Sequence, residues 1–327
     1  MRKTIYSVLS LAVILSLAIS TISCGGKKSD KSGDGGAELE GRISISGAFA
    51  LYPLAVKWAE EFQKLHPGVK IEVDGGGAGK GMTDVLAEQV DIAMVSREVS
   101  DEEAKKGAVG FPTAKDAVVP TISQQNPFYA ELVKHGISQQ AATDIWINGT
   151  IKTWGQLLGT SDQTKIAVFT RSDACGAGET FAKWLGKHQE DLLGEGVNGD
   201  PGEATAVSKN PVSLGYNNIG YAYDNTTLKP LDGIRVLPVD ANGNGKIDPE
   251  EDFYASKDQI TKAIAEGRYP SPPARDLYLV TKGLPTNPVV IAFLKYVLTD
   301  GQKQNAPVGY IDIPQEKLDA ALAKLPK

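Results

Sequence analysis

The stretch that decides the fold is residues 42–73, RISISGAFALYPLAVKWAEEFQKLHPGVKIEV. Its first five residues alternate between polar and apolar side chains, which predicts a short strand. From Tyr52 to Leu65 the apolar side chains recur at helical spacing, and His66-Pro67-Gly68 ends that helix. Val69–Val73 alternates again and predicts a second strand. This β-α-β order predicts an α/β fold in which helices cover the faces of a sheet.

Predicted strands and helices continue along the chain without an internal repeat. A glycine-rich loop is expected at Gly75–Gly81, and Ala117–Ile122 is expected to be the first strand that crosses into a second domain. The other predicted strands are Ile92–Val95, Ile166–Thr170, Ile234–Val239 and Leu277–Val280. The predicted helices are Met82–Gln89, Ser138–Trp146, Trp154–Leu158, Phe181–Leu185, Asp258–Glu266, Val289–Leu298 and Leu318–Leu325.

Length and composition limit the possible classes of protein. The 327 residues are 41% apolar, and 34 basic against 40 acidic side chains give a net charge of −6. A nucleic-acid-binding surface would require a basic excess, so no nucleic-acid partner is expected. Three histidines and two cysteines leave little for a transition-metal centre or a disulfide framework. The composition favours an α/β binding protein or an enzyme over membrane-spanning and fibrous classes.

The N-terminus carries a targeting signal. Arg2 and Lys3 precede an apolar run that ends near Cys24, the pattern of a secretory signal peptide at residues 1–23. Cys24 resembles the lipidated cysteine of bacterial lipoproteins, and a plain signal peptide with an incidental cysteine is the alternative. Residues 24–40 are polar and rich in Gly and Ser, which predicts a flexible tether. We therefore expect an extracytoplasmic protein, lipid-anchored to a bacterial membrane and exposed in the periplasm or at the cell surface.

Three loops follow a strand and lead into a helix: Ser46–Leu51, Gly75–Gly81 and Arg171–Thr180. Helix N-termini present free N–H groups, and small residues let the backbone approach a ligand closely. The glycine spacing matches neither the P-loop nor the dinucleotide motif. These loops therefore favour a small oxyanion, with tight turns as the alternative. Three cations lie in or beside them, namely Lys80, Arg97 and Arg171.

Several segments in sequence order resemble the phosphate-binding lipoproteins of bacterial phosphate ABC importers. They are residues 47–58 (GAFALYPLAVKW), 74–82 (DGGGAGKGM), 91–98 (DIAMVSRE), 171–181 (RSDACGAGETF), 199–207 (GDPGEATAV) and 275–309. The resemblance implies a type II periplasmic-binding-protein fold, with two α/β domains and a ligand cleft between them. It implies a first domain at residues 41–116 and 273–327 and a second at 117–272.

The resemblance also implies the ligand-binding positions: Ala48, Phe49, Ala50, Ala78, Gly79, Lys80, Ser96, Arg97, Arg171, Cys175, Gly176 and Ala177. Family members usually carry Ser or Thr in all three loops, whereas most of these places hold Ala, Gly or Cys here. Backbone N–H groups and cations remain as donors. Arg97 stands where several members have Asp, so a protonated phosphate lacks an obvious acceptor. Inorganic phosphate is the first expectation, and sulfate or another tetrahedral oxyanion stays open.

Two function classes follow from this pattern. The first is a monomeric solute-binding lipoprotein that delivers an oxyanion to an ABC permease. The second is a calcium-stabilised surface lipoprotein that uses the same fold for adhesion or sensing. An enzyme is not expected: a thiol at Cys175 beside Arg171 would suit a nucleophile, but no histidine lies in a matching motif. A small residue in place of a serine is the simpler interpretation of Cys175.

One further motif predicts a metal site. Residues 240–251, DANGNGKIDPEE, match the twelve-residue EF-hand loop, and a surface turn rich in Asn and Gly is the alternative. Gly245 takes the sixth position, where the loop turns sharply. The expected Ca²⁺ ligands are Asp240, Asn242, Asn244, the Lys246 carbonyl, Asp248 and Glu251. A predicted strand precedes the loop, so the usual pair of helices is missing. We expect a structural Ca²⁺ rather than a sensor site, because Ca²⁺ outside the cell binds persistently to such loops.

Overall fold

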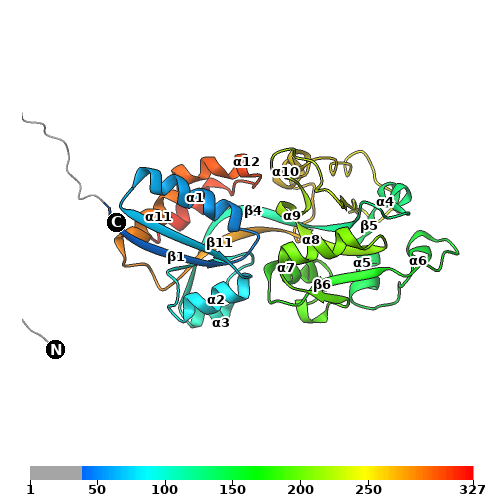
Figure 1. Ribbon diagram of the computed structural model, residues 1–327, viewed down its shortest axis with the longest axis horizontal. Helices are drawn as coiled ribbons and strands as arrows, with labels where there is room; N and C mark the ends of the chain where they lie inside the picture. Colours follow the sequence, from blue (N-terminus) through cyan, green and yellow to red (C-terminus); the bar gives the residue numbers. More distant parts are fainter. Residues whose placement is uncertain (1–38, 327) are drawn as a thin grey trace, which may run out of the picture. The chain divides into compact units, whose positions relative to one another are not determined.

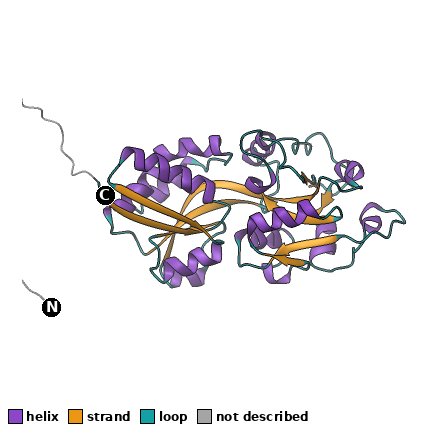
Figure 2. Cartoon of the chain, in the orientation of Figure 1, coloured by secondary structure: helices purple, strands orange, loops and turns teal. Residues whose placement is uncertain are grey.

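The computed structural model describes residues 39–326, so the predicted signal peptide, Cys24 and nearly all of the predicted tether lie outside the described residues. Among the helices that are described, none combines the length and the apolar character needed to cross a membrane. The described elements form two α/β lobes joined by two long strands (Figures 1 and 2).

The first lobe is built on a parallel core of three strands. β1 (Gly41–Gly47) lies between β2 (Val69–Gly75) and β3 (Ile92–Val95), and pairs in parallel with both. In Figure 1, α1 and α11 lie on one side of this sheet, and α2 and α3 lie on the other. The helices of this lobe are α1 (Tyr52–Leu65), α2 (Ala78–Leu86), α3 (Asp101–Lys105), α11 (Pro288–Leu298), α12 (Asn305–Val308) and α13 (Gln315–Leu322), with the 3₁₀ turn η2 (Asp300–Gln304).

Two antiparallel strands carry the chain between the lobes. β4 (Ala108–Ser123) has 16 residues, and its first part pairs with β11 (Ala274–Lys282) in the first lobe. Its last residues, from Val118 onward, pair instead with β8 and β9 of the second lobe. The predicted crossing at Ala117–Ile122 therefore lies in the second half of a longer strand. The chain returns through β11, which also pairs with β3.

The second lobe continues the same sheet in the order β4-β8-β6-β7, with β9 against β4. Its strands are β5 (Ile137–Ser138), β6 (Ala167–Arg171), β7 (Glu195–Val197), β8 (Ser213–Asn218), β9 (Ile234–Val236) and β10 (Val239–Asp240). Its helices are α4 (Tyr129–His135), α5 (Gln139–Trp146), α6 (Trp154–Leu158), α7 (Gly176–Trp184), α8 (Gly199–Lys209), α9 (Ile219–Ala222) and α10 (Lys257–Ala265), with the 3₁₀ turn η1 (Gln189–Asp191).

Each lobe has its own hydrophobic core. The first core takes residues from 43–114 and again from 277–325, including Trp58 and Phe293, which are fully buried. The second takes most of its residues from 117–274, where Trp146, Phe181 and Tyr216 pack ring against ring. The changeover falls on the crossing strands, between Ala114 and Ala117 and between Ala274 and Leu277. The second lobe is thus an insertion into the first.

Several predicted element bounds are wrong, and two of the errors share a cause. The predicted loop Gly75–Gly81 is partly helical, because α2 begins at Ala78 after Gly77, whose φ of 90° suits glycine alone. The predicted loop Arg171–Thr180 likewise gives way to α7 at Gly176. In both cases Ala and Gly in a first helical turn carry no apolar periodicity. The predicted strand Ile234–Val239 is interrupted at Leu237-Pro238, because proline cannot donate to the sheet.

Candidate functional site

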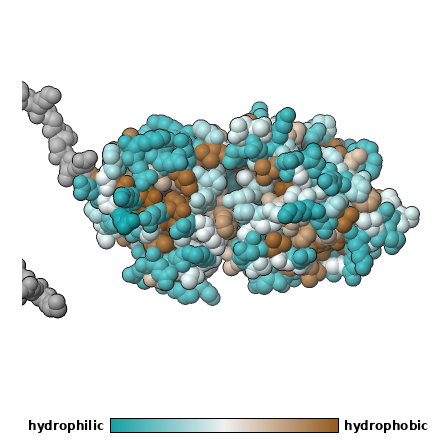
Figure 3. Space-filling view, in the orientation of Figure 1, coloured by the Kyte–Doolittle hydropathy of each residue, from teal (hydrophilic) through white to brown (hydrophobic). Residues whose placement is uncertain are grey.

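The three predicted anion loops meet where the lobes face each other, and in Figure 3 the surface is hollowed there. Backbone hydrogen bonds join the loops directly. The Gly77 N–H donates to the Gly47 carbonyl at 3.0 Å, which ties the second loop to the first. The Gly79 N–H donates to the Ala174 carbonyl at 3.0 Å, which ties the second loop to the third across the two lobes. Loops more than 90 residues apart therefore form one site.

Backbone N–H groups at this meeting point are the main uncharged donors. In the described part of the chain, the N–H groups of Phe49, Ala50, Ala78, Gly176 and Ala177 are among those that have no hydrogen-bond acceptor. They lie just before α1 and in the first turns of α2 and α7, where unpaired N–H groups and the helix dipole favour an anion. The buried hydroxyl of Ser96, just after β3, adjoins the third loop at Gly176. Alanine side chains have no hydroxyl to donate, but the backbone N–H groups at these positions remain available as donors.

Arg171 is the cation of the site, at the end of β6. Only 1% of its side chain is exposed. Its Nε and Nη2 donate to the two oxygens of Asp173 at 2.8 and 2.6 Å, and Nη1 lies 2.9 Å from Oδ2 of Asp200. Burial alone would lower the pKa of Arg171, but Asp200 and Asp173 raise it above its ordinary value. A guanidinium has five N–H bonds, so two remain for a ligand.

Gln189, which the sequence analysis did not identify, supports the third loop. Its Oε1 accepts a hydrogen bond from the Cys175 N–H at 3.0 Å, and its Nε2 donates to the Asp173 carbonyl at 2.6 Å. Gln189 lies in η1, and its own N–H donates to Glu179 of α7 at 3.1 Å. One amide side chain therefore fixes the backbone on which Arg171 and the α7 N-terminus are mounted. No local sequence signal marks this role.

Cys175 caps α7 and is a protonated thiol. Its Sγ accepts a hydrogen bond from the Gly178 N–H at 3.2 Å, as a serine hydroxyl would at this position. Burial raises the pKa of this thiol to about 12, and the nearby Arg171 lowers it only in part. A thiol in this state is a poor nucleophile. The interpretation of Cys175 as a small capping residue accounts for these contacts.

Lys80 and Arg97, the other predicted cations, are held by carboxylates of their own lobe. The Lys80 ammonium pairs with Asp84, which also accepts a hydrogen bond from the Ser46 hydroxyl at 2.7 Å. Arg97 forms a two-pronged pair with Glu103 of α3 at 2.8 and 2.7 Å. Unlike Arg171, neither is joined to the third loop by a side-chain contact. Lys80 and Arg97 therefore lie beside the site, and the charge of each is balanced by its own carboxylate partner.

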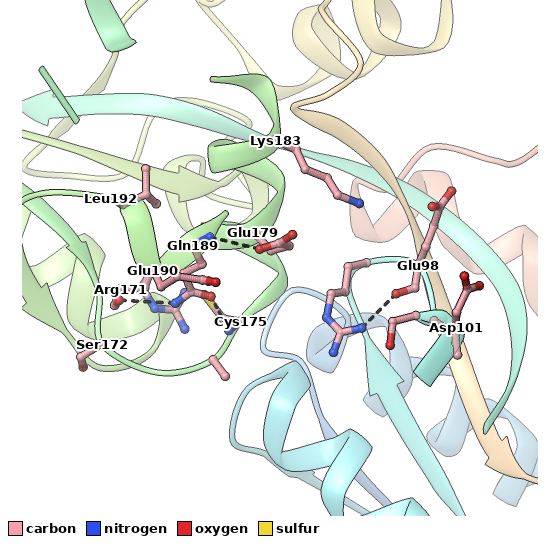
Figure 4. A pocket seen from close by; sticks show the side chains of 14 residues that line it. Glu98, Asp101, Arg171, Ser172, Cys175, Glu179, Lys183, Gln189, Glu190 and Leu192 are labelled. Carbon is pink, nitrogen blue, oxygen red and sulfur yellow. Dashed lines mark hydrogen bonds between the residues drawn. The ribbon is translucent and has the colours of Figure 1, made fainter. Parts of the chain in front are cut away.

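A cleft of about 760 Å³ leads to Arg171 and Cys175 from between the lobes (Figure 4). One wall is the segment from Arg97 to Asp101, which precedes and begins α3. The other wall comes from α7 and η1, and Lys183 projects toward the first lobe in the close-up. The cleft reaches the third loop of the site from solvent.

Glu203 is an unexpected member of the region around the site. It lies on α8, is fully buried, and neither of its carboxyl oxygens has a hydrogen-bond partner; the nearby N–H of Tyr216 lies outside hydrogen-bond geometry. Burial raises the pKa of Glu203 to about 8, against a smaller lowering by Arg171. The carboxyl is therefore protonated and neutral at pH 7. A neutral Glu203 adds no negative charge near the anion site.

The predicted calcium loop has its own geometry in the second lobe. Asp240 accepts hydrogen bonds from three backbone N–H groups, those of residues 243, 244 and 245, and Glu251 accepts from those of 241 and 242. Gly245 has a φ of 81°, in keeping with the turn expected at the sixth position. Within residues 39–326, no three His, Cys, Asp or Glu side chains are grouped closely enough to hold a metal ion.

Two α/β lobes joined by two strands, with helix N-termini at the cleft between them, define the periplasmic-binding-protein class. The chain belongs to this family: the family model described as "PBP superfamily domain" matches residues 32–301. The phosphate-binding protein PstS of Staphylococcus haemolyticus is 26% identical over 322 residues, covering 96% of this chain and 95% of the relative. That of Staphylococcus aureus strain USA300 is 25% identical over 309 residues, covering 93% and 87%.

Solved structures show the same fold. A phosphate ABC transporter substrate-binding protein from Clostridium perfringens, crystallised with bound phosphate, superposes with a TM-score of 0.67. It shares 22% identity and covers 84% of this chain and 100% of its own. An ABC-type phosphate transport receptor from Vibrio cholerae gives a TM-score of 0.59 at 24% identity, covering 83% of this chain and 100% of its own. The expected type II fold is thereby confirmed.

The protonation of Glu203 predicts a pH-dependent stability. Its pKa is about 8 in the folded protein, above the 4.5 of an ordinary glutamate, so its contribution is complete below pH 4.5 and is lost as the pH rises through 8. Glu203→Gln keeps the shape and removes the titration. We expect the variant to gain on the order of 3 kcal/mol over the wild type between pH 5 and pH 9, measured by urea unfolding.

The matched control is Glu195→Gln on β7, where the side chain is exposed. This substitution should leave the difference from the wild type constant over the same pH range. A constant difference for Glu203→Gln as well would show that Glu203 is ionised in the folded protein at neutral pH.

Proposed function

We propose that this protein is an extracytoplasmic solute-binding protein that captures inorganic phosphate and delivers it to the permease of an ABC importer. The observation that carries the proposal is a buried arginine with two unused N–H bonds beside five unpaired backbone N–H groups between two lobes. Staphylococcal relatives along nearly the whole chain are phosphate-binding proteins, and the Clostridium perfringens structure holds phosphate.

Phosphate would bind through donors from both lobes. The N–H groups of Phe49, Ala50 and Ala78 belong to the first lobe, and Arg171 with the N–H groups of Gly176 and Ala177 belongs to the second. A tetrahedral oxyanion can accept hydrogen bonds from both sets at once. Binding would therefore favour an arrangement in which the two lobes lie close together around the ligand. Hydrogen bonds to an ionised group contribute about 1.5–3 kcal/mol each. This donor set can therefore bind an anion without loop hydroxyls.

Discrimination between phosphate and sulfate depends on whether the site offers an acceptor for the phosphate proton. Phosphate near neutral pH keeps one or two protons and needs an acceptor, whereas sulfate needs donors alone. The carboxylates nearest Arg171 are already engaged: Asp173 by Arg171 and the Gly199 N–H, and Asp200 by Arg171 and Asn218. The Ser96 hydroxyl, which can both donate and accept, is the remaining side-chain candidate. We expect a smaller preference for phosphate than a site with a free carboxylate would give.

Arg171→Ala should abolish most of the anion affinity, because the anion would lose its main countercharge while Asp173 and Asp200 kept theirs. We expect phosphate affinity to fall at least a hundredfold, measured by calorimetry with phosphate, sulfate, molybdate and tungstate in turn. Arg42→Ala, which removes an exposed arginine paired with Glu72, is the control and should bind as the wild type does. A change of less than threefold for Arg171→Ala would refute its assignment as the anchor.

The alternative function, adhesion or sensing without transport, is distinguished in cells. Deletion of the gene should reduce uptake of labelled phosphate if the protein serves an importer, and leave it unchanged if it does not. We further propose that Cys24 is the lipid attachment site, in keeping with the signal peptide that precedes it. Cys24→Ala should then release the protein from the membrane fraction.

We also propose that residues 240–251 bind a structural Ca²⁺. The supporting features are the complete order of oxygen-bearing residues, the positive φ of Gly245, and the hydrogen bonds between the loop and α4. His135 Nδ1 lies 2.9 Å from the Gly245 carbonyl, and the Ile247 N–H donates to the Lys134 carbonyl at 2.8 Å. Binding would draw Asp248 and Glu251 toward Asp240 and relieve the repulsion among three carboxylates.

Calcium removal is therefore expected to lower the melting temperature and leave phosphate affinity within twofold, because no hydrogen bond or ion pair of the described residues joins residues 240–251 to the anion loops. Glu251→Gln should lower the melting temperature in the same way and make it insensitive to EDTA. The measurement is thermal unfolding with EDTA and with excess Ca²⁺. Identical curves in the two conditions would show that the loop is a turn without a metal.

A further inference from the structure

A continuous line of buried polar side chains connects the crossing strands to Arg171. Asp116 on β4 and Arg275 on β11 are partners in the strand register, and both are buried. The Arg275 guanidinium donates to the Asp116 carboxylate through Nε at 2.8 Å and through Nη2 at 3.2 Å. A buried ion pair thus bridges the two strands at the point where the chain passes between lobes.

Asn218, the last residue of β8, extends this line toward the anion site. Its Oδ1 accepts a hydrogen bond from Nη2 of Arg275, and its Nδ2 donates to Oδ1 of Asp200. The second oxygen of Asp200 lies 2.9 Å from Nη1 of Arg171. A primary amide presents an acceptor and a donor on one rigid plane, so it can join a guanidinium to a carboxylate. We call Asp116, Arg275, Asn218, Asp200 and Arg171 the buried relay.

The buried relay also reaches the helix that supplies backbone donors to the site. Nη1 of Arg275 donates to the Thr180 hydroxyl on α7 at 3.4 Å. The same helix begins at Gly176 with the unpaired N–H groups of its first turn. Arg275 therefore contacts both crossing strands, β8 and α7, and through Asn218 and Asp200 it reaches Arg171.

Charge within the buried relay is nearly balanced without a ligand. Arg171 and Arg275 are opposed by Asp116, Asp200 and the adjacent Asp173. Lys257 of α10 also faces Asp116, and burial lowers the pKa of this lysine to about 8 while Asp116 raises it. Glu203 on α8 is neutral below pH 8. Because no large positive excess attracts the anion, binding depends on the orientation of the Arg171 donors.

We infer that Asn218 and Arg275 are positioning residues for anion binding: they hold Asp200, and through it the Arg171 guanidinium, in a fixed orientation relative to the crossing strands. The inference rests on the proposed function. The inference also goes beyond the proposed function, because neither Asn218 nor Arg275 is a ligand-binding position of the anion loops. Anion affinity should therefore depend on a side chain on β11, which the ligand does not touch.

Asn218→Asp tests this with pH as the readout. When protonated, the new carboxyl can donate to Asp200 and accept from Arg275, as the amide does; when ionised, it repels Asp200. Phosphate affinity relative to the wild type at the same pH should be at least tenfold weaker at pH 8 and return to within threefold at pH 5. Taking the ratio to the wild type cancels the titration of phosphate and of Glu203. A purely structural role would not produce this recovery.

Asn217→Asp is the matched control. Asn217 precedes Asn218 on β8, is equally buried, and its Oδ1 accepts a hydrogen bond from the Thr121 hydroxyl, while its Nδ2 has no partner. Its substitution should change the affinity ratio by less than threefold at both pH values. An equal pH dependence in the two variants, or none in Asn218→Asp, overturns the inference and leaves phosphate binding by the wild type intact.

Arg275→Lys is a second test of the positioning role, and it can be used if Asn218→Asp does not fold. A lysine keeps the charge opposite Asp116 but cannot hold Asp116, Asn218 and Thr180 together. We expect phosphate affinity at least tenfold weaker than that of the wild type, with circular dichroism unchanged. Wild-type affinity in Arg275→Lys overturns the inference, and absence of phosphate binding by the wild-type protein overturns both the inference and the proposed function.

Discussion

A buried arginine requires carboxylate partners, and this requirement determines how much of the second lobe is arranged. Arg171 is almost fully buried, and an unpaired cation there would cost several kcal/mol. Asp173, two residues along the chain, and Asp200, at the start of α8, supply the partners. Holding Asp200 in turn requires Asn218 on β8. The pairing of one guanidinium thus fixes how β6, α8 and β8 sit against one another, and it leaves two N–H bonds for a ligand.

The site shows how backbone can replace side chains in anion recognition. Alanines at positions 50, 78 and 177 offer no hydroxyl, yet each is small enough for the chain to bring an unpaired N–H group to the meeting point of the lobes, whereas the Ala48 N–H donates to the Met94 carbonyl. Cys175 performs the capping task of a serine through Sγ, with Gln189 as an external support. Specificity then depends less on which side chains line the loops than on how rigidly the three helix N-termini are held.

Much of the fold could be predicted from the sequence where local signals were strong. Tyr52–Leu65, Ile92–Val95 and Trp154–Leu158 match the observed elements, and a stop at His66-Pro67 marks the end of the first. Helix α8 escaped prediction, since its buried face carries Asp200 and Glu203 in place of apolar residues. The anion loops could be predicted from small residues between strand and helix. The contacts of Asn218, Arg275 and Gln189 could not, because their partners are 10 to 159 residues distant in the chain.

Because the second lobe is inserted into the first, the two lobes can complete their cores only in a certain order during synthesis. The core of the first lobe takes residues from both ends of the described chain, so it stays incomplete until β11, α11 and α13 have emerged. The second lobe has nearly its whole core in one continuous segment and can become compact while the C-terminal residues are still being made. Until then β4 is half paired, with β8 and β9 beside its end and no β11 along its beginning. A nascent chain therefore presents a long open sheet edge until β11 is made and pairs with it.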